Sequence, residues 1–288
     1  MRTLIAASFL AMLTACGPKA GGTYEVAAAT GDASAADSIK AEADALWAER
    51  GDKAKLQAAL TKYEQAYAAN PTNQELTVKL TRGYYFLGDA HESDQDAKMA
   101  QWDTAIGWGK KCMALNKDFT ALLDKGDEDE ATAVRATTKG DVPCMYWMAT
   151  ALGKWAKANG IAKSLKHLPT VKAFIGRVSE LDPSYFHAAS DRYWGAYYSV
   201  IPSFAGQDLD KSKAHFDKSI AAAPEYFGTK VLMAENLAVK QQDQAMFDKL
   251  LDEVIAGDAA AVPAITPENT VEQAKAKALK AKKSEFFR

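Results

Sequence analysis

The sequence has little of what marks a nucleic-acid binder, a polytopic membrane protein or a disordered chain. Its 35 basic and 37 acidic side chains give a net charge of −2, so no overall field favours nucleic acid or acidic lipid. Beyond residue 13, no stretch approaches the roughly 18 consecutive apolar residues of a membrane-spanning helix. Only nine prolines and 18 glycines interrupt 288 residues, of which 48% are hydrophobic. These proportions are typical of a globular protein with long helices.

The local sequence motifs of catalysis are also missing. The four histidines, at positions 91, 167, 187 and 215, are scattered, and His91-Glu92 is not part of a zinc-protease helix motif. No nucleophile elbow, phosphate-binding loop or dinucleotide fingerprint occurs in the sequence. His91, Asp94 and Asp96 form a candidate metal site, but a polar loop between helices is the favoured interpretation. We therefore expect a non-enzymatic protein without metal or cofactor, although scattered residues can still converge in space.

The first sixteen residues resemble a bacterial lipoprotein signal. Arg2 precedes an apolar run over residues 4–13, which has the length of a signal-peptide core and is too short to span a bilayer. The run ends in LTAC, which resembles a lipoprotein box whose cysteine, here Cys16, becomes lipidated. We predict a signal peptide over residues 1–15; the alternative is an ordinary secretory signal that happens to precede a cysteine.

The residues after the box predict where the protein resides. Residues 16–37 comprise the lipidated cysteine and a stretch rich in Gly, Ala, Ser and Thr, which predicts a flexible tether. Acyl chains contribute on the order of 0.8 kcal/mol per buried methylene, so several together hold a protein durably at a membrane. Gly17 stands where an aspartate would be expected for retention at the inner membrane. We expect a periplasmic protein that is lipid-anchored to the outer membrane.

Two cysteines remain in the predicted mature chain, Cys112 and Cys144. Lipidation implies an oxidising compartment, where two leftover cysteines more often pair than stay free. A disulfide is therefore predicted, and two buried thiols on neighbouring helices are the alternative. Neither cysteine has the spacing of a zinc or thioredoxin-type site.

Residues 38–288 predict a single all-α domain, because apolar residues recur at three- and four-residue spacings. The first helical hairpin carries the tetratricopeptide pattern of small, aromatic and proline positions at Leu46, Ala59, Tyr63, Ala66 and Pro71. Later units end near residues 117, 183 and 224, at spacings that depart from the usual period of about 34 residues. We expect four degenerate tetratricopeptide-like (TPR-like) hairpins followed by a terminal helix pair.

Aromatic residues concentrate between positions 193 and 204. On a helix they form two adjacent stripes, wider than the roughly 100° that one buried face requires. They pack in the core, or they line a ligand cleft or a subunit contact. The candidate cleft or interface residues are Trp147, Trp155, Tyr193, Trp194, Tyr197, Tyr198 and Phe204. Arg192 is a candidate anchor for a carboxylate ligand; the alternative is an Asp–Arg contact within the fold.

Two stretches carry a resemblance to a known family. These are DVPCMYWMATALGKWAKANG and the segment from ELDPSYFHAASDRYWGAYYSV to MFDKLLDEVI. They resemble the TatT family, lipoproteins that are the T components associated with tripartite ATP-independent periplasmic (TRAP) transporters. The resemblance covers about residues 45–270. It departs at Ala205-Gly206-Gln207-Asp208, where the family pattern has a Gly-Gly-Asp turn.

The resemblance implies four TPR-like hairpins assembled as a ring-shaped homotrimer. It implies an apolar cleft in each subunit, docking of a periplasmic solute-binding P subunit, and handling of a small hydrophobic solute. The residues themselves allow a carboxylate-bearing ligand as well. A different function, that of a TPR-like lipoprotein in an outer-membrane assembly machine, is the alternative expectation, and a periplasmic hydrolase is a third.

Overall fold

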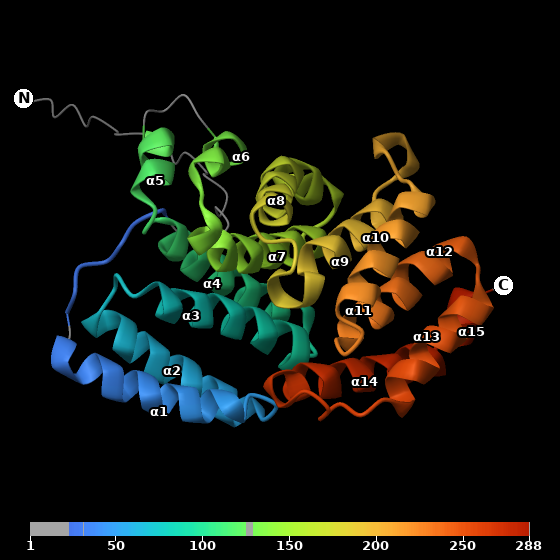
Figure 1. Ribbon diagram of the computed structural model, residues 1–288, viewed down its shortest axis with the longest axis horizontal. Helices are drawn as coiled ribbons and strands as arrows, with labels where there is room; N and C mark the ends of the chain where they lie inside the picture. The colour runs from blue at the N-terminus through green and yellow to red at the C-terminus, as the bar shows by residue number, and fades with distance from the viewer. Residues whose placement is uncertain (1–22, 31, 125–128, 288) are drawn as a thin grey trace, which may run out of the picture.

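The computed structural model describes residues 23–30, 32–124 and 129–287, and it contains helices and no strand in these residues (Figure 1). The predicted all-α fold class is therefore confirmed. No helix within these ranges has the length and apolar character needed to cross a bilayer. The predicted signal peptide and lipidated Cys16 lie outside the described residues.

Successive helices pack as antiparallel hairpins along the chain. The first two are α1 (Ala36–Ala48) with α2 (Lys53–Ala69), and α3 (Gln74–Phe86) with α4 (Gln95–Met113). The next two are α7 (Val142–Ala158) with α8 (Ile161–Leu181), and α9 (Tyr185–Val200) with α10 (Leu209–Ala222). These hairpins correspond to the four units expected from the sequence.

The remaining elements complete the chain between and after these hairpins. The insertion between the second and third hairpins contains α5 (Lys117–Asp124), α6 (Glu130–Ala133) and the short turns η3 (Val134–Ala136) and η4 (Lys139–Asp141). The expected terminal pair consists of α11 (Phe227–Leu232), the π-helical segment η6 (Met233–Ala238) and α12 (Val239–Gln241), packed against α13 (Gln244–Ala256). The chain ends with α14 (Thr266–Ala281) and α15 (Lys283–Phe286).

The tetratricopeptide positions of the first hairpin are buried as the pattern predicts. Ala59, Tyr63 and Ala66 are completely buried in α2, and Pro71 follows the helix end. The small alanines let α1 and α2 approach closely, and the Tyr63 ring fills the groove against Trp47 with 6.2 Å between ring centroids. The hairpin thus forms from residues that are local in the sequence.

Polar side chains mark where many of the helices begin. Each accepts a hydrogen bond from a backbone N–H of the first turn, which would otherwise lack an acceptor. The capping residues are Asp52, Asn73, Asp94, Asp129, Asp208 and Asp243. Loss of such a cap typically costs about 1 kcal/mol.

A disulfide joins α4 to α7 in the central part of the core, between Cys112 and Cys144. Both cysteines are completely buried, among aromatic and aliphatic side chains of α4, α7 and α8. Separate apolar clusters fill the N-terminal hairpin and the C-terminal helices.

Residues 23–30 of the expected tether run along the helical body (Figure 1), and the last two residues of the tether belong to α1, which begins at Ala36. The Tyr24 ring packs edge-to-face on Phe119 with 5.4 Å between centroids, and its hydroxyl lies 3.9 Å from the sulfur of Met148. The backbone N–H of Thr30 donates to the carbonyl of Ala68 at 2.8 Å. These contacts hold Tyr24 and Thr30 against the helical body.

The two ends of the fold meet across a buried ion pair. Figure 1 shows the start of α14 beside the junction of α1 and α2. Arg50, from that junction, binds Glu268 of α14 with 2.7 Å between Nη2 and the carboxylate. Helix α14 (Thr266–Ala281) therefore packs against the N-terminal hairpin.

Candidate functional site

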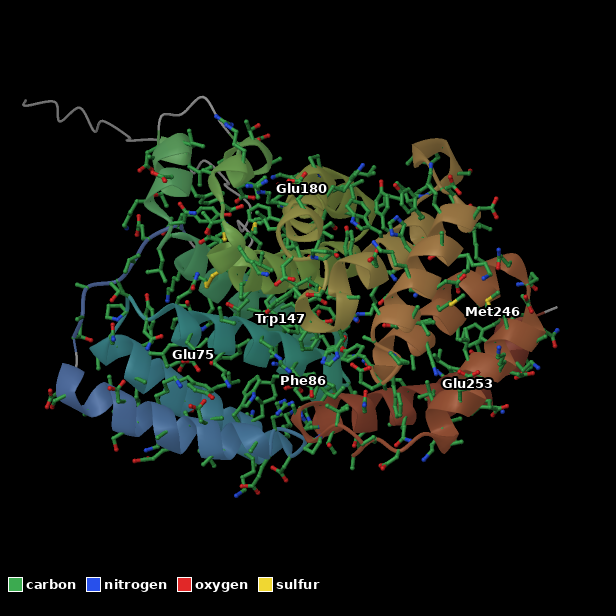
Figure 2. All side chains as sticks on the ribbon, viewed as in Figure 1. Glu75, Phe86, Trp147, Glu180, Met246 and Glu253 are labelled. Carbon is green, nitrogen blue, oxygen red and sulfur yellow. A yellow bond between two sulfur atoms is a disulfide. The ribbon has the colours of Figure 1, made fainter. Side chains whose placement is uncertain are left out.

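A large cavity lies among α3, α4, α7, α8, α9, the C-terminal helices and α14. Its volume is about 720 Å³, which falls in the range of about 300–1,000 Å³ typical of small-molecule sites. Phe86 and Trp147, which both line it, lie near the centre of the molecule in Figure 2. Most of the lining is apolar or aromatic, with a limited set of charged groups.

Two π-helical segments reach this cavity. The segment η2 (Leu87–His91) contributes Asp89, and η6 contributes Glu235 and Asn236. Such segments are rare in proteins and are frequently found at functional sites. Both segments therefore contribute charged or polar side chains to the lining.

A third irregular segment also reaches the cavity, the left-handed turn (residues 186–188). Phe186, His187 and Ala188 have φ values of 43°, 59° and 51°, although none is glycine. A left-handed conformation costs an L-residue roughly 1–2 kcal/mol, so the surrounding contacts must hold the turn in place. The ring of Phe186 lines the cavity as a consequence.

Arg192 holds this turn from one helical turn further along α9. Its guanidinium donates to the carbonyls of His187 at 3.0 Å and Phe186 at 3.3 Å. It also donates to the hydroxyl of Tyr146 at 3.2 Å, and it lies over the Tyr226 ring at 4.3 Å from the centroid. Arg192 is thus both a support for the turn and part of the cavity wall.

Asp191 and Arg192 do not form the ion pair that was the alternative to a ligand-binding role for Arg192. Asp191 instead contacts His215 Nδ1 and Lys218 Nζ, each at 2.9 Å. Within the described residues, no carboxylate forms an ion pair with Arg192, whose exposed fraction is 4%. The guanidinium is therefore buried among neutral acceptors and aromatic rings.

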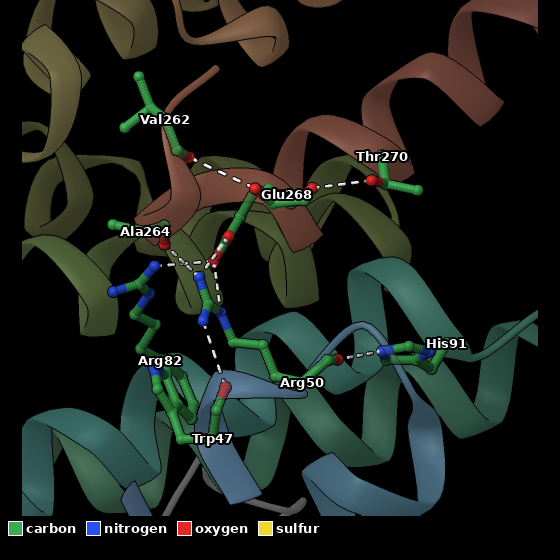
Figure 3. A network of polar contacts seen from close by, with 9 residues as sticks. Trp47, Arg50, Arg82, His91, Val262, Ala264, Glu268 and Thr270 are labelled. Carbon is green, nitrogen blue, oxygen red and sulfur yellow. Dashed lines mark hydrogen bonds and ion pairs between the residues drawn. The ribbon is translucent and has the colours of Figure 1, made fainter. Parts of the chain in front are cut away.

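Glu268, which lines the cavity, holds two arginines (Figure 3). It accepts hydrogen bonds from Arg50 and from Arg82, whose nearest nitrogens each lie 2.7 Å from the carboxylate. Burial alone would raise the pKa of Glu268, but the hydrogen bonds from Arg50 and the charge of Arg82 outweigh burial and lower the pKa. Arg82 also lies over the Phe186 ring at 4.7 Å, so this cluster reaches the left-handed turn.

A second charged cluster adjoins the first. Asp89 lies 2.6 Å from Lys154 and 2.6 Å from Lys275, and Lys275 lies 2.8 Å from Glu272. Burial would raise the pKa of Asp89, but the charges of Lys154 and Lys275 hold that pKa far below its usual range. Asp89 therefore remains ionised and positions both ammonium groups.

The predicted cleft residues divide into two groups. Four of them line the cavity: Trp147, Arg192, Tyr193 and Tyr197. Ala196 and Val200 of the same part of α9, and Ile201 directly after it, also line the cavity. The sequence left core packing, a cleft and a subunit contact open for this segment, and the spacing did not decide between them.

The other four lie elsewhere. Trp194 donates from Nε1 to the hydroxyl of Ser179 on α8 at 3.2 Å. Trp155 packs edge-to-face on His167, and Tyr198 stacks on His215. Phe204 is 83% exposed in the short turn η5 (Ser203–Ala205).

Several lining residues had no local signal in the sequence. Arg82, Tyr85, Asp89, Tyr146, Phe186, Tyr226 and Glu268 come from distant segments and share no motif. The one clue was compositional, because polar and aromatic residues on otherwise apolar helices mark positions where a helix does not face the core.

The candidate metal residues do not form a metal site in the structure. His91 Nε2 lies 3.0 Å from the carbonyl oxygen of Arg50, and Asp94 caps α4 by accepting from the backbone N–H of Ala97. No cluster of three or more His, Cys, Asp or Glu side chains arranged for a metal occurs in the described part of the chain.

The chain is similar to proteins of one family. A family model described as "TRAP transporter T-component" matches residues 52–287. A protein of Treponema pallidum (strain Nichols), described as "Uncharacterized protein", is 24% identical over 251 residues, covering 78% of this chain and 76% of that protein.

Proposed function

The chain belongs to the TRAP transporter T-component family, and on that premise we propose that it docks a periplasmic solute-binding P subunit and holds a small hydrophobic or carboxylate solute. Members of this family are extracytoplasmic accessory components of a transport system. The family match over most of the chain is the observation that carries the proposal.

The cavity supports the binding of a solute. Its walls are largely aromatic and aliphatic, as small-molecule sites generally are, and ten charged residues also line it. The left-handed turn and the two π-helical segments place Phe186, Asp89 and Asn236 on the lining, and the turn does so at a cost in backbone energy.

The proposed location follows from the N-terminal sequence. Cys16, acylated after removal of residues 1–15, would hold the chain at the outer membrane. Tyr24 and Thr30 bind the following segment to the body. The helical body would therefore lie close to the membrane surface, where a solute-binding subunit can reach it.

Assembly as a homotrimer is part of the proposal. Phe204 is a candidate subunit contact, because it is the most exposed large apolar side chain of the described residues. The body carries out no chemical step of its own in this scheme: it binds a solute, and it binds a partner.

Sedimentation velocity tests this function. The full chain, purified as the C16S variant so that no acyl group is attached, is run alone and with the P subunit encoded in the same TRAP system. We expect a trimer and a faster-sedimenting complex. A strict monomer that never co-sediments with the P subunit would refute the docking role.

The alternative role in outer-membrane assembly makes a different prediction. Deleting the gene would then sensitise cells to detergents and large antibiotics. Under the transport role, deletion reduces solute uptake and leaves the permeability of the envelope unchanged.

A further inference from the structure

The inner end of the cavity has an excess of positive charge. Five basic side chains and three carboxylates form it or lie directly behind it: Arg50, Arg82, Lys154, Arg192 and Lys275 with Asp89, Glu268 and Glu272. The carboxylates are all engaged by the other four basic groups, and Arg192 has none of them as a partner. A bound carboxylate would reduce this excess from two positive charges to one.

Arg192 is the group for which an anion is most favourable. Its guanidinium is almost completely buried, and its hydrogen bonds go to two carbonyls and to the hydroxyls of Tyr146 and Thr229. A buried charge is costly unless it is paired with an opposite charge, and neutral acceptors compensate it only in part. These four bonds engage both Nη groups, so Nε–H is the donor that remains for a charged partner such as a carboxylate.

Three tyrosines that line the cavity interact with this guanidinium and are the candidate donors to the same anion. Arg192 acts electrostatically on Tyr85, Tyr146 and Tyr226, and all three line the cavity. The Tyr146 oxygen accepts from Arg192, so its own proton is free to be donated. The hydroxyls of Tyr85 and Tyr226 have no hydrogen-bond partner among the described residues. Burial raises the pKa of both Tyr85 and Tyr226, so these groups stay protonated donors.

The outer end of the cavity is apolar and open to solvent. Ile161, Leu165 and Val200 line it and are 63%, 46% and 48% exposed. They lie together because α8 and α9 are antiparallel: Ser179 contacts Trp194, and Lys172 lies over the Tyr197 ring. Exposed aliphatic side chains at the rim of a cavity suit the hydrocarbon part of a ligand.

We propose that the cavity binds a single-chain amphiphile with one negative charge. Its carboxylate accepts hydrogen bonds from Arg192, Tyr85 and Tyr226 at the inner end, and its hydrocarbon chain extends toward Leu165 and Val200. This inference rests on the proposed solute-binding function and specifies the class of solute. An uncharged hydrocarbon would leave the positive charge of Arg192 without an anionic partner.

The test compares three probes of equal chain length, dodecanoate, dodecanol and dodecyltrimethylammonium, by isothermal titration with the C16S full chain. We expect dodecanoate to bind at least about tenfold more tightly than either other probe, the ratio that a hydrogen bond to a charged group supplies. Equal affinity for dodecanol and dodecanoate would overturn the proposal.

Matched tyrosine variants locate the carboxylate. The hydroxyls of Tyr226 and Tyr85 have no described protein partner, so Y226F and Y85F should keep the stability of the fold. Each should weaken dodecanoate about tenfold and leave dodecanol unchanged. The control is Y198F, because Tyr198 does not line the cavity. Dodecanoate binding that is unchanged in both Y226F and Y85F would overturn the assignment.

Two further measurements test the apolar end of the cavity and the number of hydrocarbon chains in the ligand. L165N should weaken dodecanoate and dodecanol alike, because it alters the apolar end only. Extraction of a two-chain anionic phospholipid from vesicles, without binding of dodecanoate, would overturn the single-chain assignment. Dodecanoate binding without co-sedimentation of the P subunit would refute the docking role and leave the ligand class intact, and the reverse result would refute only the ligand class.

Discussion

Replacing Glu268 by glutamine is expected to destabilise the fold strongly. The substitution removes the one carboxylate that Arg50 and Arg82 share, while the carbonyl of Ala264 remains as a neutral acceptor for Arg50. Arg50 is 4% exposed and Glu268 7%, so water cannot replace the lost charge. Breaking a buried ion pair by removing one partner typically costs 3–5 kcal/mol.

The same substitution has an opposite effect on ligand binding. Because Arg82 lines the cavity and loses its carboxylate, E268Q adds one uncompensated positive charge to the inner end. We therefore expect E268Q to bind dodecanoate more tightly than the parent chain, although it unfolds more easily. If E268Q were both less stable and unable to bind dodecanoate, the substitution would have collapsed the cavity.

The pH dependence of the stability follows from the lowered pKa of Glu268. Because its folded-state pKa lies below the ordinary value of 4.5, the stabilisation is complete above that value and is lost as the pH falls through the folded-state pKa. The difference in stability between the parent chain and E268Q should therefore shrink on acidification below about pH 4.5.

Urea unfolding followed by circular dichroism measures this effect, with E180Q as the matched control. Glu180 pairs with Arg177 on the surface of α8 and is 65% exposed, so E180Q should cost less than about 1 kcal/mol. We expect E268Q to cost about 3 kcal/mol or more. If E268Q proves as stable as E180Q at neutral pH, the ion pair between Arg50 and Glu268 does not stabilise the contact between the two ends of the fold.

Three further predictions concern packing and backbone geometry. Reducing the disulfide between α4 and α7 should lower the free energy of unfolding by about 3.5–4 kcal/mol in the chain-entropy model, measured by urea unfolding with and without reductant. G195A should lower the free energy of unfolding by about 1–3 kcal/mol, because its methyl group would lie 2.6 Å from the Phe216 ring. G176A has nothing within 4 Å of its methyl group and should stabilise α8 by about 0.5–1 kcal/mol. Equal melting temperatures of the two variants would contradict this. A188G should be at least about 1 kcal/mol less destabilising than A189G, because Ala188 has a left-handed φ of 51° and its neighbour is helical; the reverse order in thermal unfolding would show that the turn is unstrained.

Local patterns were sufficient to predict the helical architecture. The all-α class and the hairpins follow from apolar spacing, which is decided within a few turns of helix. Ala59 and Tyr63 occupy the positions that the tetratricopeptide pattern gives them, because small and aromatic residues determine how two neighbouring helices meet.

The candidate site was predictable only where one helix supplies it. Tyr193 and Tyr197 line the cavity from α9, and their spacing on one helix made them candidates for a cleft, a subunit contact or the core. Arg82 and Glu268 meet only because α14 returns to the N-terminal hairpin, a contact between residues 186 positions apart. No property of either local sequence indicates that partner.

The left-handed turn could not be predicted for a different reason. Positive φ values favour glycine, and residues 186–188 contain none. The turn exists because tertiary contacts, above all the two hydrogen bonds from Arg192, compensate for its strain. Helical propensity alone would have continued α9 regularly through this segment.

Native mass spectrometry of the C16S chain, mixed with its P subunit and dodecanoate, tests the central claim most directly. It reports the oligomer, the bound partner and the retained acid in one spectrum. We expect a complex that contains three copies of the chain, at least one P subunit and the added mass of dodecanoate. Separate masses for the bare chain and the P subunit at every mixing ratio would contradict the proposed role.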